Sequence, residues 1–293
     1  MVKKALLIGI NYIGTNNELR GCINDVLDIQ SLLVTHCNYN TSNICVLTET
    51  NEFKPTYNNI LSNIQWLVSS NLPGDTLIFY YSGHGSYINE NNNNINSNNN
   101  DESDGKDEII MPVDYNTSGI IIDDWLYTNM VKKVSSEVNL WVFTDCCNSG
   151  TNSDLYYNCE YLCDSSDSSD SNNSNNSNNS NNSNNCEDTY IISYQKNKEE
   201  AMSISGNICM FSGCLDDQLS IDGFIDNKFQ GVFTSCFIDF IKAHCKSEIF
   251  QENTITLFDA LKEINTRMHN LNFKQRSMLS VGNISDMQKY LNL

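Results

Sequence analysis

Apolar residues recur along the chain in two spacings, and together these predict an alternating order of strands and helices. Short continuous apolar runs, typical of buried parallel strands, lie at residues 5–10, 44–47, 76–80, 140–144, 208–211 and 278–281. Segments with helical spacing lie at residues 24–33, 56–72, 125–134, 229–242 and 257–268. We therefore expect an α/β fold with a mostly parallel central sheet and helices on both of its faces.

Two low-complexity segments interrupt this order. Residues 89–100 are nearly all Asn, and residues 165–185 are a repeat of Ser and Asn with a few Asp. Neither segment can bury apolar area, so we expect both to be disordered loops on one folded domain.

Charge and cysteine content exclude several classes of protein. The 36 acidic residues against 17 basic ones give a formal charge of -19, which argues against nucleic-acid binding. No signal peptide opens the sequence and no apolar run approaches the length of a membrane span, so we expect neither secretion nor membrane insertion. The 12 cysteines are too sparse for a disulfide scaffold, which favours a reducing, cytoplasmic location.

Two short strings at strand ends carry the candidate chemistry. Tyr81-Ser82-Gly83-His84-Gly85-Ser86 closes the run at 76–80, and Asp145-Cys146-Cys147-Asn148-Ser149-Gly150 closes the run at 140–144. Open α/β sheets bind ligands at the carboxyl ends of their strands. A thiol beside an imidazole is a workable nucleophile, so His84 is the candidate base and Cys147 the candidate nucleophile of an acyl transfer.

Alternation along an extended chain predicts which side chains share a face. By this rule Ser82 points with His84, and Asp145 points with Cys147. The same spacing favours Cys147 over Cys146 as the nucleophile only if Asp145 lines the cleft. From the spacing alone, either cysteine could be the nucleophile.

These strings resemble the signatures of the metacaspases, cysteine peptidases of the caspase-hemoglobinase fold. The resemblance spans nearly the whole chain, because further matching strings begin at Leu19, Asp104, Ile122, Ser212 and Phe229. The chain departs from the family at Asn148, where a His is usual.

The resemblance implies roles for the residues of the two strings. It makes His84 and Cys147 the catalytic dyad, turns Cys146 away from the cleft, and assigns the oxyanion hole to the backbone amides of Gly85 and Cys147. It also implies that Asp25, Ser82 and Asp145 line the pocket for the residue before the cut. Two carboxylates there would select Arg or Lys.

The resemblance also implies a metal and an internal processing segment. Asp107, Asp123, Asp124 and Asp154 match the family's calcium site, and carboxylates are ligands that calcium prefers. Residues 1–163 correspond to a large-subunit-like portion, 164–188 to a linker and 189–293 to a small-subunit-like portion. Because the sequence has no Lys or Arg between Lys133 and Lys196, we expect self-cleavage at Lys196 or Lys198.

The sequence thus predicts a monomeric, calcium-dependent cysteine endopeptidase that cleaves protein substrates after Arg or Lys through a thioester. An alternative is a catalytically silent relative that acts as a binding or regulatory module. A third hypothesis is a peptidase of the same fold with Asp or Asn specificity.

Overall fold

The computed structural model describes residues 1–89, 106–147, 155–162, 189–194, 204–215, 218, 220–246, 249–250 and 254–293. The low-complexity loops, the linker, Asn148, Asp154, Lys196 and Lys198 lie outside these residues. In the described part of the chain, no helix is long and apolar enough to cross a membrane.

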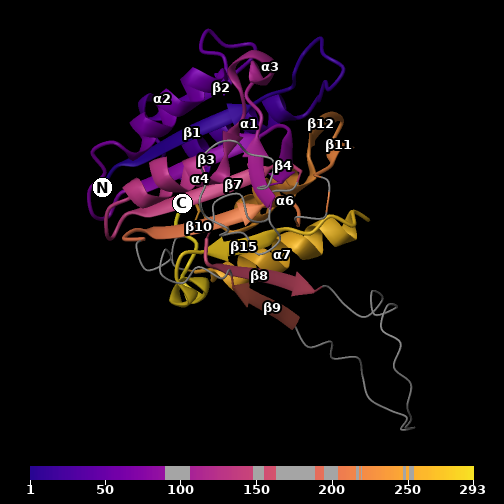
Figure 1. Cartoon of the computed structure of the whole chain (residues 1–293). Helices are drawn as coiled ribbons and strands as arrows, with labels where there is room; N and C mark the ends of the chain where they lie inside the picture. Colours follow the sequence, from indigo (N-terminus) through magenta and orange to yellow (C-terminus); the bar gives the residue numbers. More distant parts are fainter. Residues whose placement is uncertain are drawn as a thin grey trace.

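One eight-stranded sheet forms the centre of the molecule, in the order β2-β1-β3-β7-β10-β15-β8-β9 (Figure 1). Its strands are β1 (Lys3–Gly9), β2 (Ile44–Thr48), β3 (Thr76–Ser82), β7 (Asn139–Asp145), β8 (Tyr157–Leu162), β9 (Thr189–Tyr194), β10 (Asn207–Ser212) and β15 (Met278–Val281). From β2 to β10 neighbouring strands pair in parallel, whereas the pairs β10–β15, β15–β8 and β8–β9 are antiparallel. Segments on both sides of the predicted linker therefore contribute strands to the same sheet.

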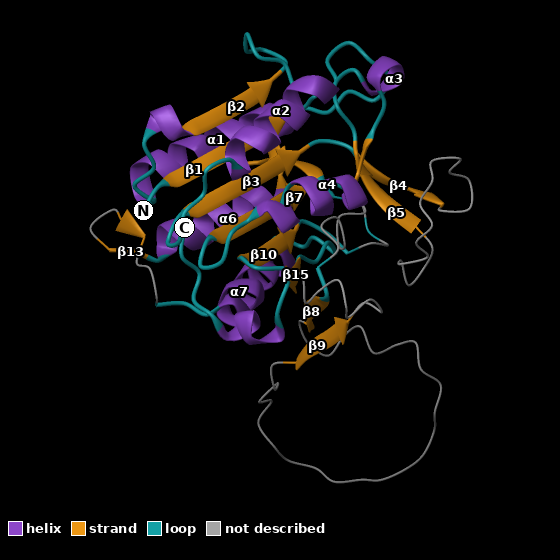
Figure 2. Ribbon diagram, turned by 60° about the vertical axis from the view of Figure 1, so that its left-hand side comes forward, coloured by secondary structure: helices purple, strands orange, loops and turns teal. Residues whose placement is uncertain are grey.

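Helices cover both faces of the sheet (Figure 2). They are α1 (Cys22–His36), α2 (Tyr57–Val68), α3 (Tyr115–Ser118), α4 (Asp123–Asn129), α6 (Val232–Ala243) and α7 (Leu257–Asn270), with 3-10 turns η1 (Thr41–Asn43), η3 (Val131–Lys133) and η4 (Ile284–Gln288). Successive residues of β3 alternate between two cores: Ile78 and Tyr80 pack with α1, α6 and α7, while Leu77 and Phe79 pack with α2 and α4. This confirms the predicted α/β fold with a mostly parallel sheet.

Small sheets at the periphery were not predicted. β4 (Gly85–Asn89), β5 (Lys106–Ile110) and β6 (Ile121–Ile122) form one, β11 (Asp222–Ile225) pairs with β12 (Lys228–Gly231), and β13 (Cys245–Lys246) pairs with β14 (Ile249–Phe250). A short run at 108–111 overlaps β5, and β6 lies in a run of three Ile at 120–122, but each gives only three apolar residues in a row.

The bounds of the predicted helices differ by a few residues from those in the structure, and in two cases part of the predicted helix belongs to another element. The helix expected at 229–242 begins at Val232, because Phe229 and Gln230 belong to β12 and the Phe229 ring packs edge-on against Phe224 across the hairpin. The helix expected at 125–134 starts earlier, at Asp123, and ends at Asn129, after which the chain tightens into η3.

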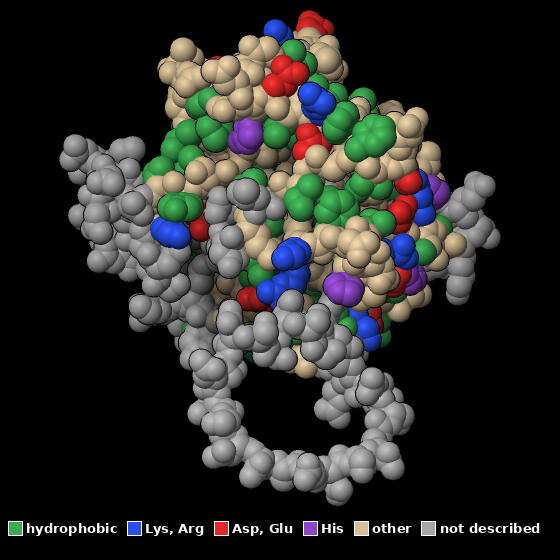
Figure 3. All heavy atoms as spheres, turned by 90° about the vertical axis from the view of Figure 1, so that its right-hand side faces the viewer, with side chains coloured by type: hydrophobic (Ala, Val, Ile, Leu, Met, Phe, Trp, Pro, Cys, Tyr) green, Lys and Arg blue, Asp and Glu red, His purple; other side chains and the backbone are tan. Residues whose placement is uncertain are grey.

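The surface agrees with the charge balance of the sequence. On the face drawn in Figure 3, described Lys and Arg side chains lie in small groups beside acidic side chains. Among the described residues of this face there is no continuous basic surface of the kind that binds nucleic-acid backbones.

Candidate active site

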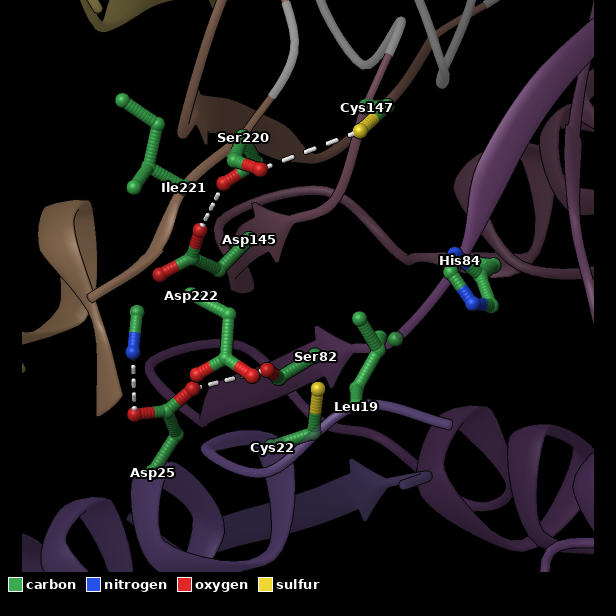
Figure 4. Close-up of a pocket in the computed structure, with 12 residues that line it drawn as sticks. Leu19, Cys22, Asp25, Ser82, His84, Asp145, Cys147, Ser220, Ile221 and Asp222 are labelled. Carbon is green, nitrogen blue, oxygen red and sulfur yellow. Dashed lines mark hydrogen bonds between the residues drawn. The ribbon is translucent and has the colours of Figure 1, made fainter. Parts of the chain in front are cut away.

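The two sequence strings meet because their strands are neighbours. β3 and β7 pair in parallel, with Ser82 opposite Asp145 at their carboxyl ends. A pocket opens there (Figure 4), lined by Leu19, Cys22, Asp25, Ser82, Gly83, His84, Asp145, Cys147, Ser220, Ile221, Asp222 and Gly231. All residues predicted for the dyad and the specificity pocket therefore line one cavity.

Asp25 and Asp145 are both held by hydrogen bonds from the protein. Asp25, at 1% exposure, accepts the backbone N–H of Gly231 at 2.9 Å and the hydroxyl of Ser82 at 2.8 Å. Asp145 accepts the backbone N–H and hydroxyl of Thr234 at 3.0 and 2.7 Å on one oxygen, and the Ser220 hydroxyl on the other. Gly231 lies between the two carboxylates, where any side chain would overlap Asp145.

Burial dominates the protonation of these two acids. It raises the pKa of Asp25 well above its usual value, and the nearby Asp145 carboxylate raises it further. Burial also raises the pKa of Asp145, although hydrogen bonds from Ser220 and Thr234 oppose the effect. A cation entering the pocket would favour the ionised forms of both acids, since opposite charges stabilise one another at short range.

The imidazole of His84 is fixed by a backbone carbonyl. Its Nε2 lies 2.7 Å from the carbonyl oxygen of Asn17, which can only accept, so Nε2 carries the proton and Nδ1 is left as the basic nitrogen. The Tyr12 ring lies 4.6 Å from the imidazole, centroid to centroid. His84 and Ser82 line the same pocket, although β3 ends at Ser82, and their side chains have different partners there.

Cys147 and Cys146 occupy different surroundings. Cys147 lines the pocket, with its Sγ 3.9 Å from the carbonyl oxygen of Ser220. Cys146 is 1% exposed and belongs to the core shared with α2 and α4. In this arrangement the Cys147 thiol and the imidazole each contact a backbone carbonyl rather than one another, and burial raises the pKa of Cys147, so the resting thiol is protonated.

The residues predicted to bind calcium are only partly described. Asp107 and Asp123 are 5% and 1% exposed, and Asp123 accepts the backbone N–H groups of Glu108 and Asp124 at 2.7 and 2.8 Å. Within the described ranges, no group of three or more His, Cys, Asp or Glu side chains is arranged to hold a metal ion. The described carboxylates thus do not form a metal site by themselves.

The sequence analysis missed three polar residues of the pocket. Asp222 adds a third carboxylate, Ser220 holds Asp145, and Cys22 places a second thiol on the pocket wall. Asp222 and Ser220 follow β10 by several residues, so only the tertiary fold brings them to the ends of β3 and β7. The family-like string that begins at Ser212 ends shortly before Ser220 and Asp222, but it does not include either residue and predicted no role for them.

Comparisons with known proteins show which proteins this chain is similar to. Residues 3–156 match the family model "Metacaspase, peptidase C14 domain". Metacaspase-1 of Scheffersomyces stipitis is 32% identical over 305 residues, covering 97% of this chain and 72% of that protein. Metacaspase-1 of Candida albicans is 48% identical over 158 residues, and the match spans 53% of this chain but only 35% of that protein. Protein GSU0716 from Geobacter sulfurreducens shares the fold, with a TM-score of 0.61, 19% identity and coverage of 99% of this chain and 97% of that one.

Proposed function

Because this chain belongs to the metacaspase family of cysteine peptidases, we propose that it is an endopeptidase that cleaves after Arg or Lys through Cys147 and His84. The observation that carries the proposal is the single pocket in which a thiol, an imidazole and three carboxylates meet. A thiol and an imidazole perform acyl transfer, and the carboxylates suit a basic side chain.

The first half-reaction forms a thioester. Nδ1 of His84 takes the thiol proton, and the sulfur of Cys147 attacks the carbonyl carbon of the scissile peptide bond. Hydrogen bonds from the backbone N–H groups of Gly85 and Cys147 stabilise the negative charge that develops on the carbonyl oxygen. When the intermediate collapses, the C–N bond breaks and the amine leaves with the proton from His84.

The second half-reaction regenerates the enzyme. His84 takes a proton from water, the resulting hydroxide attacks the thioester, and the acid product leaves as the thiol is restored. The carbonyl of Asn17 keeps its acceptor role on Nε2 throughout, so it stabilises each imidazolium that forms.

The charge of the pocket supports specificity for Arg and Lys. Among the described residues that line it, Asp25, Asp145 and Asp222 are acidic and none is Lys or Arg. An Asp side chain in the same place would add a fourth carboxylate to a poorly hydrated cluster, which is unfavourable.

We also propose that calcium promotes the activity, on the family resemblance and on the oxygen chemistry of Asp107, Asp123, Asp124 and Asp154. The monomeric state and self-cleavage at Lys196 or Lys198 remain predictions of the same resemblance, and the cytoplasmic location remains a prediction from the cysteine content.

Cleavage of four matched fluorogenic peptides, ending in Arg, Lys, Asp or Asn, tests the proposal on the full chain with and without calcium. We expect turnover of the Arg and Lys peptides by the wild type and none by Cys147→Ala. Equal signals from both proteins would favour the silent binding module, and turnover of the Asp or Asn peptide alone would favour the third hypothesis.

A further inference from the structure

One loop holds the imidazole of His84 from two sides. The loop, residues 11–19, connects β1 to α1. Its Tyr12 ring packs against the imidazole at a centroid distance of 4.6 Å and a tilt of 35°, and the Tyr12 hydroxyl accepts the backbone N–H of His84 at 3.0 Å. Its Asn17 carbonyl accepts from Nε2 at 2.7 Å. The position of this loop therefore sets both the tilt and the rotation of the ring.

The start of the loop has a backbone conformation that needs support. Tyr12 has a φ of 52°, in the left-handed region that costs a non-glycine residue about 1 kcal/mol or more. The Tyr12 hydroxyl is anchored, since it donates to the carbonyl of Met111 at 2.7 Å. Its backbone, however, belongs to no helix or strand that could hold it.

Glu49 supplies that support from the neighbouring strand. It directly follows β2 and accepts three successive backbone N–H groups of the loop. Its Oε2 lies 2.5 Å from the nitrogen of Asn11 and 3.0 Å from that of Tyr12, and its Oε1 lies 2.8 Å from that of Ile13. Hydrogen bonds to a carboxylate are stronger than those to neutral acceptors, so this carboxylate fixes the loop where it turns.

Hydrogen bonds within the loop connect the turn held by Glu49 to Asn17, whose carbonyl accepts from Nε2 of His84. The Tyr12 carbonyl accepts the backbone N–H and hydroxyl of Thr15 at 3.1 and 2.8 Å. The Thr15 hydroxyl oxygen in turn accepts the N–H of Asn17 at 3.2 Å. A displacement at Tyr12 is thus passed to the carbonyl of Asn17.

We propose that Glu49 is a positioning residue for His84: its carboxylate holds the loop whose Tyr12 ring and Asn17 carbonyl orient the imidazole. This inference rests on the proposed function in assigning His84 as the base. When Glu49 loses its charge, the loop loosens, the Asn17 carbonyl leaves Nε2, and the imidazolium loses an acceptor.

The test is the ¹⁵N nuclear magnetic resonance spectrum of the labelled imidazoles, in their neutral form, in the full-length wild type and in Glu49→Gln. The chain has 4 His, and His84→Gln assigns the signals of interest. Glu52→Gln is the matched control, since it removes the same charge from an exposed side chain three residues further on. In the wild type and in Glu52→Gln we expect the signals of a His84 ring protonated on Nε2 alone. In Glu49→Gln we expect the averaged signals of both tautomers, because the Asn17 carbonyl no longer selects one.

Peptide turnover gives a second readout. Glu49→Gln should lower kcat on the Arg peptide by about 10- to 100-fold with KM changed less than about twofold, because the pocket for the basic residue is untouched. If Glu49→Gln does not fold, Glu49→Asp keeps the charge but shortens the reach to the three N–H groups, and it is expected to lower kcat in the same direction.

Unchanged His84 signals in Glu49→Gln, or in Glu49→Asp if that variant has to replace it, would overturn the inference. The spectrum does not depend on turnover. A wild type that cleaves none of the peptides would therefore contradict the proposed function, while the role of Glu49 would still be decided.

Discussion

Gly85 and Cys147 approach so closely that a methyl group at Gly85 would overlap the carbonyl oxygen of Cys147. The same methyl group would lie only 2.9 Å from the sulfur of the buried Cys146, so it could not move toward the core to avoid the overlap. Glycine at position 85 is therefore required by the contact between the end of β7 and the start of β4.

Gly85→Ala should abolish activity while the fold persists. The added methyl group must push the Cys147 backbone away, which displaces both the nucleophile and an amide proposed for the oxyanion hole. We expect kcat to fall by about 100-fold or more. Gly223→Ala is the matched control, because its Cβ would meet its nearest neighbours at 3.4 Å, an ordinary contact. Equal turnover by the two variants in the peptide assay would show that activity does not require glycine at position 85.

Asp25→Asn should stabilise the protein while it weakens cleavage after Arg. The amide can still accept the Gly231 N–H and can donate to the Ser82 hydroxyl, but it carries no charge to desolvate. Because the pKa of Asp25 is raised on folding, the wild type is penalised increasingly as pH rises above the usual value of an Asp carboxyl. The variant has no such penalty, so its advantage should grow with pH.

Thermal unfolding of Asp25→Asn and wild type between about pH 4 and 8 checks this sign. We expect an advantage of roughly 1 kcal/mol or more at the alkaline end, and little at the acid end. Asp226→Asn, which alters an exposed carboxylate in the turn between β11 and β12, is the control. A variant that is less stable than wild type at every pH would contradict the account of Asp25.

Calcium should raise the unfolding temperature of the full chain if it binds the folded state, and it should accelerate turnover. Asp124→Asn should weaken both effects, since it removes one charged ligand. Magnesium is the control ion, because it dehydrates reluctantly and demands stricter geometry. If a calcium chelator leaves peptide turnover unchanged, the proposal that calcium promotes the activity is wrong.

Self-processing should occur at Lys196 or Lys198, the first basic residues after Lys133. Mass spectrometry of fragments formed after calcium addition identifies the cut. The double variant Lys196→Gln, Lys198→Gln should remain intact over the same period. A first cut within residues 165–185 would contradict specificity for Arg and Lys, since that segment contains neither.

The sequence predicted best those features that depend on residues close together in the chain, such as individual strands. Continuous apolar runs located β3 and β7, and parallel pairing of buried strands then brought His84 and Cys147 to the same edge of the sheet. Asp222, Ser220 and Glu49 were not found, because each acts through contacts with residues far away in the chain. Glu49 follows a strand in an ordinary polar segment, and its three N–H donors become visible only when β1 and β2 lie side by side.

The errors in helix bounds have a similar origin. Phe229 continues the apolar pattern of α6, yet its ring packs on Phe224 in a hairpin. Gly231, whose N–H is bonded to Asp25, separates the hairpin from the helix. A tertiary contact of the pocket thus decides where α6 begins.

The most direct test of the central claim is covalent labelling of the full-length protein by a peptidyl-Arg chloromethyl ketone, followed by peptide mapping. We expect a single adduct on Cys147 that is absent from Cys147→Ala and His84→Ala, and no adduct from the matching Asp reagent. Labelling of Cys146 or Cys22 instead, or equal labelling by the Arg and Asp reagents, would contradict it.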